Sequence, residues 1–385
     1  MRHFDFLDEA ERSRLFLHPP QPFDVDDGTE TVGVGLGATL YCPATRPALA
    51  KDIVRRRAAG VMSVVVCLED SVPDVELAAA ERNAVAQLGV LGGCGAALPM
   101  IFVRVRNEQQ IAMIVEGLGE HARVVTGFVV PKFGEDSGGY LNAVMDAASR
   151  SGVALFAMPV LESAELAFLE SRTSALNGIR QLLDKYREIV PAVRIGATDL
   201  SGAYGLRRAR EFTVWDVRVV ADVISSVVNI FGRVAPGPYV VTGPVWEYFP
   251  DRERMFKPQL RESPFVAHAE RSLRAEILAS DLDGLIREVA LDRANGLTGK
   301  TVIHPTHVAA VHALSVVGFE EYADAGDILA TEGRGGATAS TFGNKMNESK
   351  PHTAWAMRTM VRARLFGVAR EQTSFVDLLG AGLHA

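Results

Sequence analysis

The sequence has little cysteine: Cys42, Cys67 and Cys94 are the only three in 385 residues, and none is spaced as Cys-x-x-Cys. An odd number without paired spacing argues against a disulfide framework, and reduced thiols are typical of cytoplasmic proteins. An excess of basic residues is also missing, because 40 Lys and Arg stand against 47 Asp and Glu for a net charge of −7. We therefore expect neither a nucleic-acid partner nor an anionic membrane partner.

Long apolar runs and nucleotide-binding motifs are missing as well. No uninterrupted stretch reaches the roughly 18 apolar residues of a membrane span. The segment 1–10 is charged and has no signal-peptide core, so we expect a soluble, cytoplasmic protein. No Gly-x-Gly-x-x-Gly follows the first expected strand, and Gly299-Lys300-Thr301 lacks the upstream glycine of a phosphate-binding loop.

Apolar runs of strand length are what the chain has in quantity. Most are separated by stretches with helical periodicity, such as 48–59, 74–89 and 215–231. Alternation of this kind predicts a parallel α/β fold, and the number of strands favours a (β/α)8 TIM barrel over an open doubly wound sheet, which periodicity alone does not exclude. The expected strands are Ala38–Pro43, Val61–Leu68, Met100–Arg106, Gly127–Lys132, Val153–Leu161, Val193–Ala197, Tyr239–Thr242 and Thr301–His304.

The barrel is predicted to span 37–330, between two flanking regions. Residues 1–36 contain Pro-Pro-Gln-Pro and a glycine-rich run, so we expect an N-terminal extension made mostly of loop, with room for one short helix. Residues 331–385 are expected to form a linker, rich in Gly, Ala, Ser and Thr over 331–341, followed by an amphipathic helix at 353–366 that docks on the barrel or on a neighbouring subunit. The segment 244–280 is predicted to be an insertion or an elaborated βα segment.

Two strands end in a carboxylate. Phe156-Ala-Met-Pro-Val-Leu runs into Glu162, and Arg194-Ile-Gly-Ala-Thr runs into Asp199. Because the carboxyl ends of barrel strands converge on one mouth, both carboxylates are expected there. One or two carboxylates are what Mg²⁺ commonly takes from a protein, so Glu162 and Asp199 are the predicted metal ligands.

Other polar residues follow the remaining strands, and together they could bind a substrate carboxylate and move protons. Each has a structural alternative. Glu69 and Asp70 could start a helix, Arg104 and Arg106 could form ion pairs at the barrel bottom, and Lys132 could be a solvated loop residue. His304 could be a structural histidine, and Cys67 is more easily a core residue than a nucleophile. The candidates are Arg46, Glu69, Asp70, Arg104, Arg106, Lys132, Glu162, Asp199 and His304.

The motifs also resemble the HpcH/HpaI aldolase and citrate lyase β-subunit family, in family order from about residue 38 to 367. The matching segments are Leu40-Tyr-Cys-Pro43-Ala-Thr-Arg46-Pro, Val65-Val-Cys-Leu-Glu69-Asp70-Ser-Val, Val103-Arg104-Val, Val130-Pro131-Lys132, the stretches around Glu162 and Asp199, and Gly296-Leu-Thr-Gly299-Lys300-Thr-Val-Ile-His304-Pro305. The first two are most similar to a longer branch of carbon–carbon bond lyases from stress operons.

The resemblance implies a TIM barrel, Mg²⁺ dependence and a homo-oligomer, commonly a trimer or hexamer. It implies carbon–carbon bond chemistry beside a carboxylate or thioester through a metal-stabilised enolate. By the same resemblance Arg104 holds the substrate carboxylate, with Arg46, Ala197, Thr198 and His304 as further substrate contacts.

The chain departs from the family pattern at three places. Cys67 replaces an acid, Arg106 replaces an asparagine, and Asn347 or Glu348 stands where members acting on CoA thioesters offer an aspartate to the neighbouring subunit. Glu348 is therefore our candidate for a C-terminal catalytic acid or base.

The sequence thus predicts an Mg²⁺-dependent lyase or aldolase acting on a 2-oxo or 3-hydroxy acid, with a carboxylate or a CoA thioester as substrate. The catalytic candidates are Glu69, Asp70, Arg104, Lys132 and Glu348. Two alternatives remain open at this point: a malyl-CoA-like thioesterase, and a non-catalytic component of a biosynthetic complex.

Overall fold

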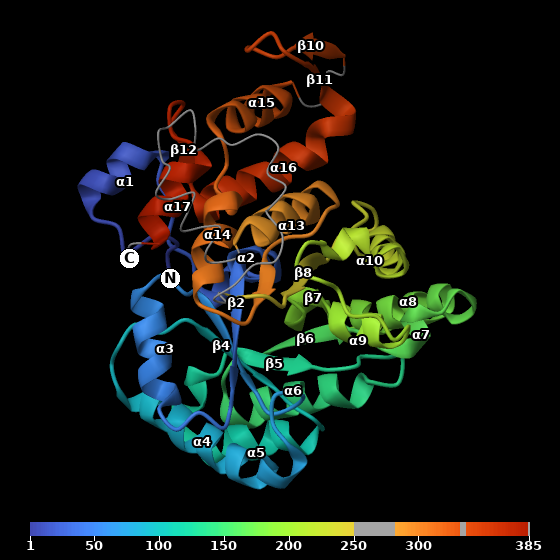
Figure 1. The fold of residues 1–385 in the computed structure, drawn as a ribbon. Helices are drawn as coiled ribbons and strands as arrows, with labels where there is room; N and C mark the ends of the chain where they lie inside the picture. Colours follow the sequence, from blue (N-terminus) through green and yellow to red (C-terminus); the bar gives the residue numbers. More distant parts are fainter. Residues whose placement is uncertain (250–281, 332–335, 384–385) are drawn as a thin grey trace.

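A closed barrel of eight parallel strands forms the centre of the molecule (Figure 1). The computed structural model describes residues 1–249, 282–331 and 336–383. Each strand pairs with the next in chain order and β9 returns to β2, so the predicted (β/α)8 TIM barrel is confirmed. The barrel strands are β2 (Ala38–Pro43), β3 (Ser63–Cys67), β4 (Met100–Arg104), β5 (Gly127–Val130), β6 (Phe156–Leu161), β7 (Ala192–Ile195), β8 (Val240–Trp246) and β9 (Lys300–Val302).

Helices surround the barrel because each has one apolar face. In α10 (Arg218–Phe231), Val220, Val223, Ile224 and Val227 are completely buried and follow helical spacing. The other barrel helices are α3 (Leu49–Ala58), α4 (Leu77–Gly93), α5 (Gln109–Leu118), α6 (Gly138–Ser151), α7 (Ala164–Ala167), α8 (Leu169–Asp184), α9 (Ala197–Gly202), α13 (Leu282–Ala294) and α14 (Thr306–Ser315). Among the described residues, no helix is long and apolar enough to span a bilayer.

The N-terminal extension contains more regular structure than predicted. It holds α1 (Glu9–Leu15), β1 (Phe16–His18) and α2 (Thr29–Gly35). Helix α2 contacts β7 and β8 at their starts, where Gly33 approaches so closely that a Cβ would lie 2.1 Å from the carbonyl oxygen of Pro191. Residues of α2 thus share a core cluster with the apolar barrel interior. The expectation of mostly loop was wrong because tertiary contacts, which composition does not reveal, stabilise α2.

The C-terminal region packs on the same side of the molecule as the extension (Figure 1). Helix α15 (Phe319–Ala330) packs along α16 (Ser349–Phe366), which contains the predicted helix and also contacts α2. The expected linker instead includes β10 (Ala337–Ala339), paired with β11 (Met346–Glu348). The chain ends with β12 (Val368–Ala369), which pairs with β1, and α17 (Phe375–Leu383). Most of the predicted 244–280 insertion lies outside the described residues, although its first residues belong to β8.

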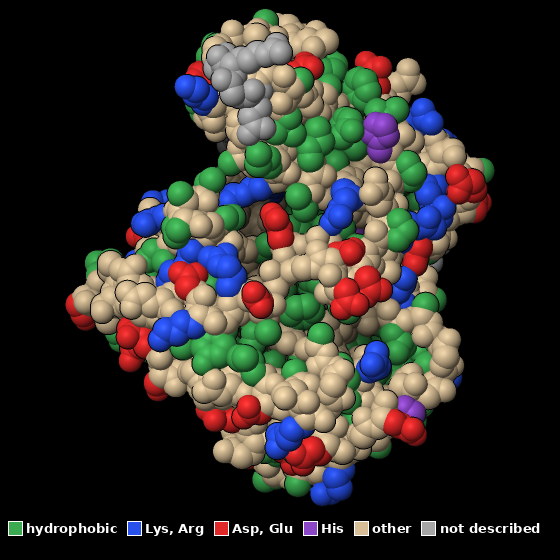
Figure 2. Space-filling view, turned by 180° about the vertical axis from the view of Figure 1, so that it is seen from behind, with side chains coloured by type: hydrophobic (Ala, Val, Ile, Leu, Met, Phe, Trp, Pro, Cys, Tyr) green, Lys and Arg blue, Asp and Glu red, His purple; other side chains and the backbone are tan. Residues whose placement is uncertain are grey.

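The surface carries charges of both signs. On the face drawn in Figure 2, acidic and basic side chains are interspersed around the hollowed centre. This distribution agrees with the small negative net charge of the sequence.

A buried ion network supports the barrel wall behind β8 and β9. Lys300 Nζ lies 2.7 Å from Glu288 and 2.6 Å from Asp292, and all three side chains are almost completely buried. Arg208 donates to Glu288, and Trp215 Nε1 donates to Asp292 at 2.8 Å. The network ties β9 and α13 to the segment that follows α9, which carries Asp199.

Replacing Lys300 with methionine should lower the free energy of unfolding by about 3–5 kcal/mol, because two buried carboxylates would lose a cation. Urea titration measures this loss. As a control, Lys51→Met removes an exposed lysine of α3 and should change the free energy of unfolding by less than about 0.5 kcal/mol. Equal effects of the two substitutions would contradict a special role for the buried network.

Candidate active site at the carboxyl ends of the strands

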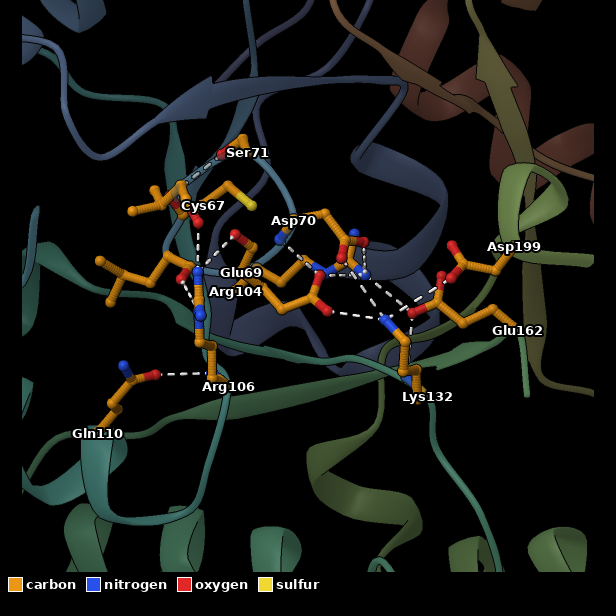
Figure 3. A network of polar contacts seen from close by, with 12 residues as sticks. Cys67, Glu69, Asp70, Ser71, Arg104, Arg106, Gln110, Lys132, Glu162 and Asp199 are labelled. Carbon is orange, nitrogen blue, oxygen red and sulfur yellow. Dashed lines mark hydrogen bonds and ion pairs between the residues drawn. The ribbon is translucent and has the colours of Figure 1, made fainter. Parts of the chain in front are cut away.

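Arg104 lies at the centre of the mouth, at the end of β4. Its Nη2 is 2.7 Å from Glu69, 3.1 Å from Asp70 and 2.8 Å from Glu162, so a single nitrogen contacts three carboxylates (Figure 3). Burial acts to lower the pKa of Arg104, but Glu162 and the other anions raise it overall. Of the described residues, none accepts a hydrogen bond from Nη1 of Arg104. This nitrogen remains available for a ligand.

Lys132 follows β5 and joins the same cluster. Its Nζ lies 2.8 Å from Glu69 and 3.6 Å from both Asp70 and Asp199, and its backbone N–H donates to Glu162 at 3.0 Å. Burial opposes the charge of Lys132, but the bond to Glu69 raises its pKa overall. The backbone φ of 47° is in the left-handed region, which is costly for lysine and is retained where the surroundings require it.

Glu162 and Asp199 meet at the mouth (Figure 3). Glu162 directly follows β6, whereas Asp199 lies in the first turn of α9, after β7, and not at the strand end where it was expected. Glu162 is buried, and burial raises its pKa to about 7 against the lowering effect of Arg104, with Asp199 raising it further. The carboxylate of Glu162 lies against Gly196, where a Cβ would come within 2.0 Å of Oε2. Because Gly196 has no side chain, the carboxylate of Glu162 has room to lie against the start of α9, next to Asp199.

Glu69 and Asp70 titrate as a pair beside these cations. Burial acts to raise the pKa of Glu69, but its hydrogen bond with Asp70 and the charge of Arg104 lower it. For Asp70, burial and the neighbouring Glu69 raise the pKa. Neither residue caps a helix, since the next helical turn begins after Pro73. The pair thus provides one readily ionised carboxylate and one that holds a proton more strongly.

Arg106 positions this pair, a role that the sequence did not reveal. Its Nε donates to the carbonyl of Leu68 at 2.7 Å, and its other nitrogens donate to the Glu69 and Val72 carbonyls and to Asp74 (Figure 3). All these acceptors belong to the β3–α4 segment 68–74. The only signal in the sequence was that arginine replaces the family's asparagine there.

Arg194 is a second residue whose position the sequence left unassigned. It lies inside the barrel on β7 and is 1% exposed. Its guanidinium donates to Thr39 at 3.3 Å and to Thr301 at 2.6 Å, and it lies 5.6 Å from the ring centre of Tyr41. Burial raises the pKa of Tyr41, and Arg194 and Arg104 act against this rise. Tyr41 therefore stays a neutral phenol between the two arginines.

Six predicted residues meet in one network, whereas the others lie elsewhere. Arg46 pairs with Asp52 at 3.1 Å and is half exposed. Thr198 donates to Glu247 at 2.9 Å, while the neighbouring Ala197 is buried. His304 stacks on Phe249 with a ring separation of 5.6 Å and contacts Thr306. The residues brought together are Glu69, Asp70, Arg104, Lys132, Glu162 and Asp199.

The structure also shows where the residues that depart from the family pattern lie. Cys67 is 3% exposed and is a core residue at the end of β3. Asn347 is buried and donates to Asp324 at 2.8 Å, so its amide holds β11 against α15. Glu348 lies on β11, and among the described residues no hydrogen bond or ion pair joins it to the six-residue network.

A cavity of about 610 Å³ opens beside the network. Its wall comes from the segments after β3, β4 and β5. The lining residues are Glu69, Asp70, Val72, Asp74, Arg106, Pro131, Lys132, Asp136, Ser137 and Tyr140. A small substrate bound at Arg104 therefore has room to extend toward α6.

The carboxylates suit a hard cation such as Mg²⁺. Among the described residues, no group of three or more His, Cys, Asp or Glu side chains is arranged to hold a metal. Mg²⁺, however, commonly takes one or two carboxylates and completes its shell with water and substrate oxygens. Glu162 and Asp199 supply that number, and their mutual repulsion contributes to the raised pKa of Glu162. A cation between them would relieve this repulsion.

Comparison with known families identifies the chain. A sequence profile described as C-C bond lyase of the TIM-barrel fold matches residues 30–368. The chain belongs to this family of carbon–carbon lyases. The expected class of reaction, carbon–carbon bond cleavage, is thereby confirmed. A search of curated proteins found no significant match.

Several solved structures share this fold. A citrate lyase from Burkholderia xenovorans LB400 has a TM-score of 0.60 at 15% identity, covering 91% of this chain and 96% of its own. CitE from Mycobacterium tuberculosis, in complex with magnesium, acetoacetate and coenzyme A, has a TM-score of 0.52 at 19% identity over 85% and 97%. Haloferax volcanii malate synthase, as a magnesium and glyoxylate complex, has a TM-score of 0.51 at 14% identity, covering 71% of this chain and 73% of its own. At these identities the likeness shows the fold alone.

Proposed function

We propose that this lyase cleaves a 2-oxo or 3-hydroxy acid in an Mg²⁺-dependent retro-aldol reaction. The observation that carries the proposal is the position of Arg104, whose Nη2 is held by three carboxylates while Nη1 is available. A fixed guanidinium of this kind suits a substrate carboxylate. The acids beside it suit proton transfer and a cation.

Each residue of the network would have a distinct task. Arg104 binds and orients the substrate carboxylate, and Glu162 and Asp199 hold the cation. When bound, Mg²⁺ supplies Lewis-acid polarisation of a substrate carbonyl. A carboxylate of the Glu69–Asp70 pair takes the hydroxyl proton as the carbon–carbon bond breaks, and the pair then delivers a proton to the enolate carbon. Burial and the neighbouring Glu69 raise the pKa of Asp70, which suits Asp70 to hold that proton. The charge of Lys132 keeps Glu69 ionised.

Similar proteins support this proposal by analogy. The M. tuberculosis CitE structure contains magnesium with acetoacetate and coenzyme A, and the H. volcanii malate synthase structure contains magnesium with glyoxylate. Both ligand sets combine a divalent cation with a small carboxylate. The carboxylates and the arginine at the mouth of this barrel offer the groups that such a pair requires.

Metal removal and substitution of its proposed ligands test the reaction. With 2-oxo and 3-hydroxy acids as candidates, we expect EDTA, Glu162→Gln and Asp199→Asn each to reduce cleavage about 100-fold or more. Product carbonyls are measured by trapping with a hydrazine. Asp146→Asn, an exposed substitution on α6, is the matched control and should retain full activity.

Cleavage that survives both chelation and substitution would rule out the metal mechanism. Release of free CoA from a malyl-CoA-like thioester, without a carbonyl product, would instead favour a thioesterase.

We also propose that the chain acts as a homo-oligomer, a trimer or hexamer, in which Glu348 is offered to a neighbouring subunit. Glu348 immediately precedes α16, and within residues 1–249, 282–331 and 336–383 its side chain joins no network at the mouth of its own barrel. Large apolar side chains near it are exposed: Met346 at 57%, Trp355 at 40% and Met357 at 48%. Exposed apolar side chains of this size favour a contact with another chain.

A further inference from the structure

The cavity beside the network has an unusual balance of hydrogen-bonding groups. We call it the side pocket, lined by the segment 69–74, by Arg106, and by the segment 131–140. It contains four carboxylates, those of Glu69, Asp70, Asp74 and Asp136, and two cations. Its formal charge is therefore negative, and the question is which of these groups remain available to a ligand.

Both cations of the side pocket are already engaged by the protein. Nε, Nη1 and Nη2 of Arg106 each donate to the segment 68–74, as described above. Lys132 Nζ donates to Glu69 at 2.8 Å and has two further carboxylates at 3.6 Å. A phosphate or carboxylate entering this pocket would have to displace the partners of Arg106 or share Lys132 with three carboxylates, and it would also meet the remaining acids.

The groups that remain available are acceptors. The side chains of Asp70 and Asp74 are 55% and 92% exposed, and Asp136 is exposed as well. Tyr140 donates its proton to the carbonyl of Arg106 at 2.9 Å, which leaves its oxygen as an acceptor. Ser137 is only 7% exposed and its oxygen already accepts from the backbone N–H of Gly134 at 2.9 Å, so it offers a ligand little. The exposed carboxylates and Tyr140 therefore favour a ligand with many donors.

We propose that the side pocket receives the half of the substrate remote from the Arg104 carboxylate, and that this half carries hydroxyl or ammonium groups rather than an anionic group. The inference rests on the proposed function, because Arg104 and the metal pair fix the other half. Specificity follows from hydrogen bonds between donors of the ligand and the pocket carboxylates. Arg106 contributes by holding the segment 68–74, which carries Asp70 and Asp74, along the wall. The phosphorylated arm of a CoA thioester is excluded from this pocket by charge.

Binding of small probes to the full-length chain tests the inference without turnover. The probes are xylitol for hydroxyl groups, 1,3-diamino-2-propanol for ammonium groups, and phosphopantetheine for an anionic arm. Saturation-transfer NMR gives their dissociation constants. We expect the first two to bind and phosphopantetheine not to bind. Added salt at about 0.5 M should weaken the diamine but not xylitol, which separates the two sources of donors.

Two variants locate the binding in the side pocket. Asp136→Lys should weaken both donor probes about tenfold, because it removes an acceptor and adds a cation. Glu135→Lys is the matched control, since the side chain of Glu135 lies against Gly178 on α8, outside the pocket lining. It should change binding less than twofold. Thermal melting of both variants confirms that they fold.

Three results would overturn the inference. Phosphopantetheine could bind in a way that changes in Asp136→Lys, both donor probes could fail to bind, or Asp136→Lys and Glu135→Lys could affect probe binding equally. None of these results bears on Mg²⁺-dependent cleavage, which is measured separately. Conversely, a loss of the metal mechanism would leave probe binding unchanged, so the two proposals can fail independently.

Discussion

Arg104→Met should lower kcat/KM for carbon–carbon cleavage by about 10³-fold, because it removes the group proposed to hold the substrate carboxylate. Loss of one preorganised, charged donor typically costs 10²–10³ in rate, and loss of the carboxylate contact adds weaker substrate binding. The substitution also leaves Glu69, Asp70 and Glu162 without their shared partner. Steady-state kinetics on the best substrate of the candidate panel provide the measurement.

Arg104→Lys is the matched control for charge. Lysine restores one cation but not the planar fork, so it should recover stability fully and activity only in part. Urea titration of both variants separates these effects, since a purely structural role would show equal losses of activity and stability. An Arg104→Met enzyme that keeps more than a tenth of the wild-type kcat/KM would show that the carboxylate is held elsewhere.

The sequence predicted the barrel because its signal is local and repeated. Each strand is a short apolar run between amphipathic helices, and a parallel barrel needs nothing more specific to be recognised. The same reasoning placed Glu162 and Asp199 at one mouth, although Asp199 lies on α9 and not at the end of β7. Which side chains pair with one another at the mouth could not be predicted from periodicity. The contact of Arg104 with three carboxylates depends on how far side chains from β3, β4 and β6 reach across the mouth.

The parts missed by the sequence depend on contacts between distant segments. Arg106 acts through the path of the segment 68–74, and a loop path is not encoded by periodicity. Arg194 is held by hydroxyl groups of β2 and β9, more than a hundred residues away from it. Helix α2 is stabilised by the barrel strands that it covers. In each case the residue type was visible, but its partner was not.

His312 should make the protein acid-labile. It is buried on α14, where its Nε2 accepts from the backbone N–H of Ala38 at 3.2 Å, and burial lowers its pKa to about 3. The unfolded chain has a histidine pKa near 6.5, so below that pH the unfolded state binds more protons than the folded state. Stability is therefore fully present above pH 6.5 and is lost as the pH falls toward 3. The loss from this residue is on the order of 4 kcal/mol.

Comparison with His312→Gln isolates this contribution, because glutamine offers an acceptor in place of Nε2 and does not titrate. Urea titration gives the free energy of unfolding of both proteins at each pH, and the difference between them at pH 7.5 serves as the reference. We expect the wild type to lose stability relative to the variant progressively between pH 6.5 and 4. The neighbouring His3, whose ring centre lies 4.7 Å away and whose pKa burial also lowers, remains in both proteins. Its contribution and those of the carboxylates therefore largely cancel. If stability depends on pH in the same way in both proteins, His312 must accept a proton in the folded state. That would require water or a carboxylate to reach its ring, which is enclosed by Phe4, His3 and Phe366.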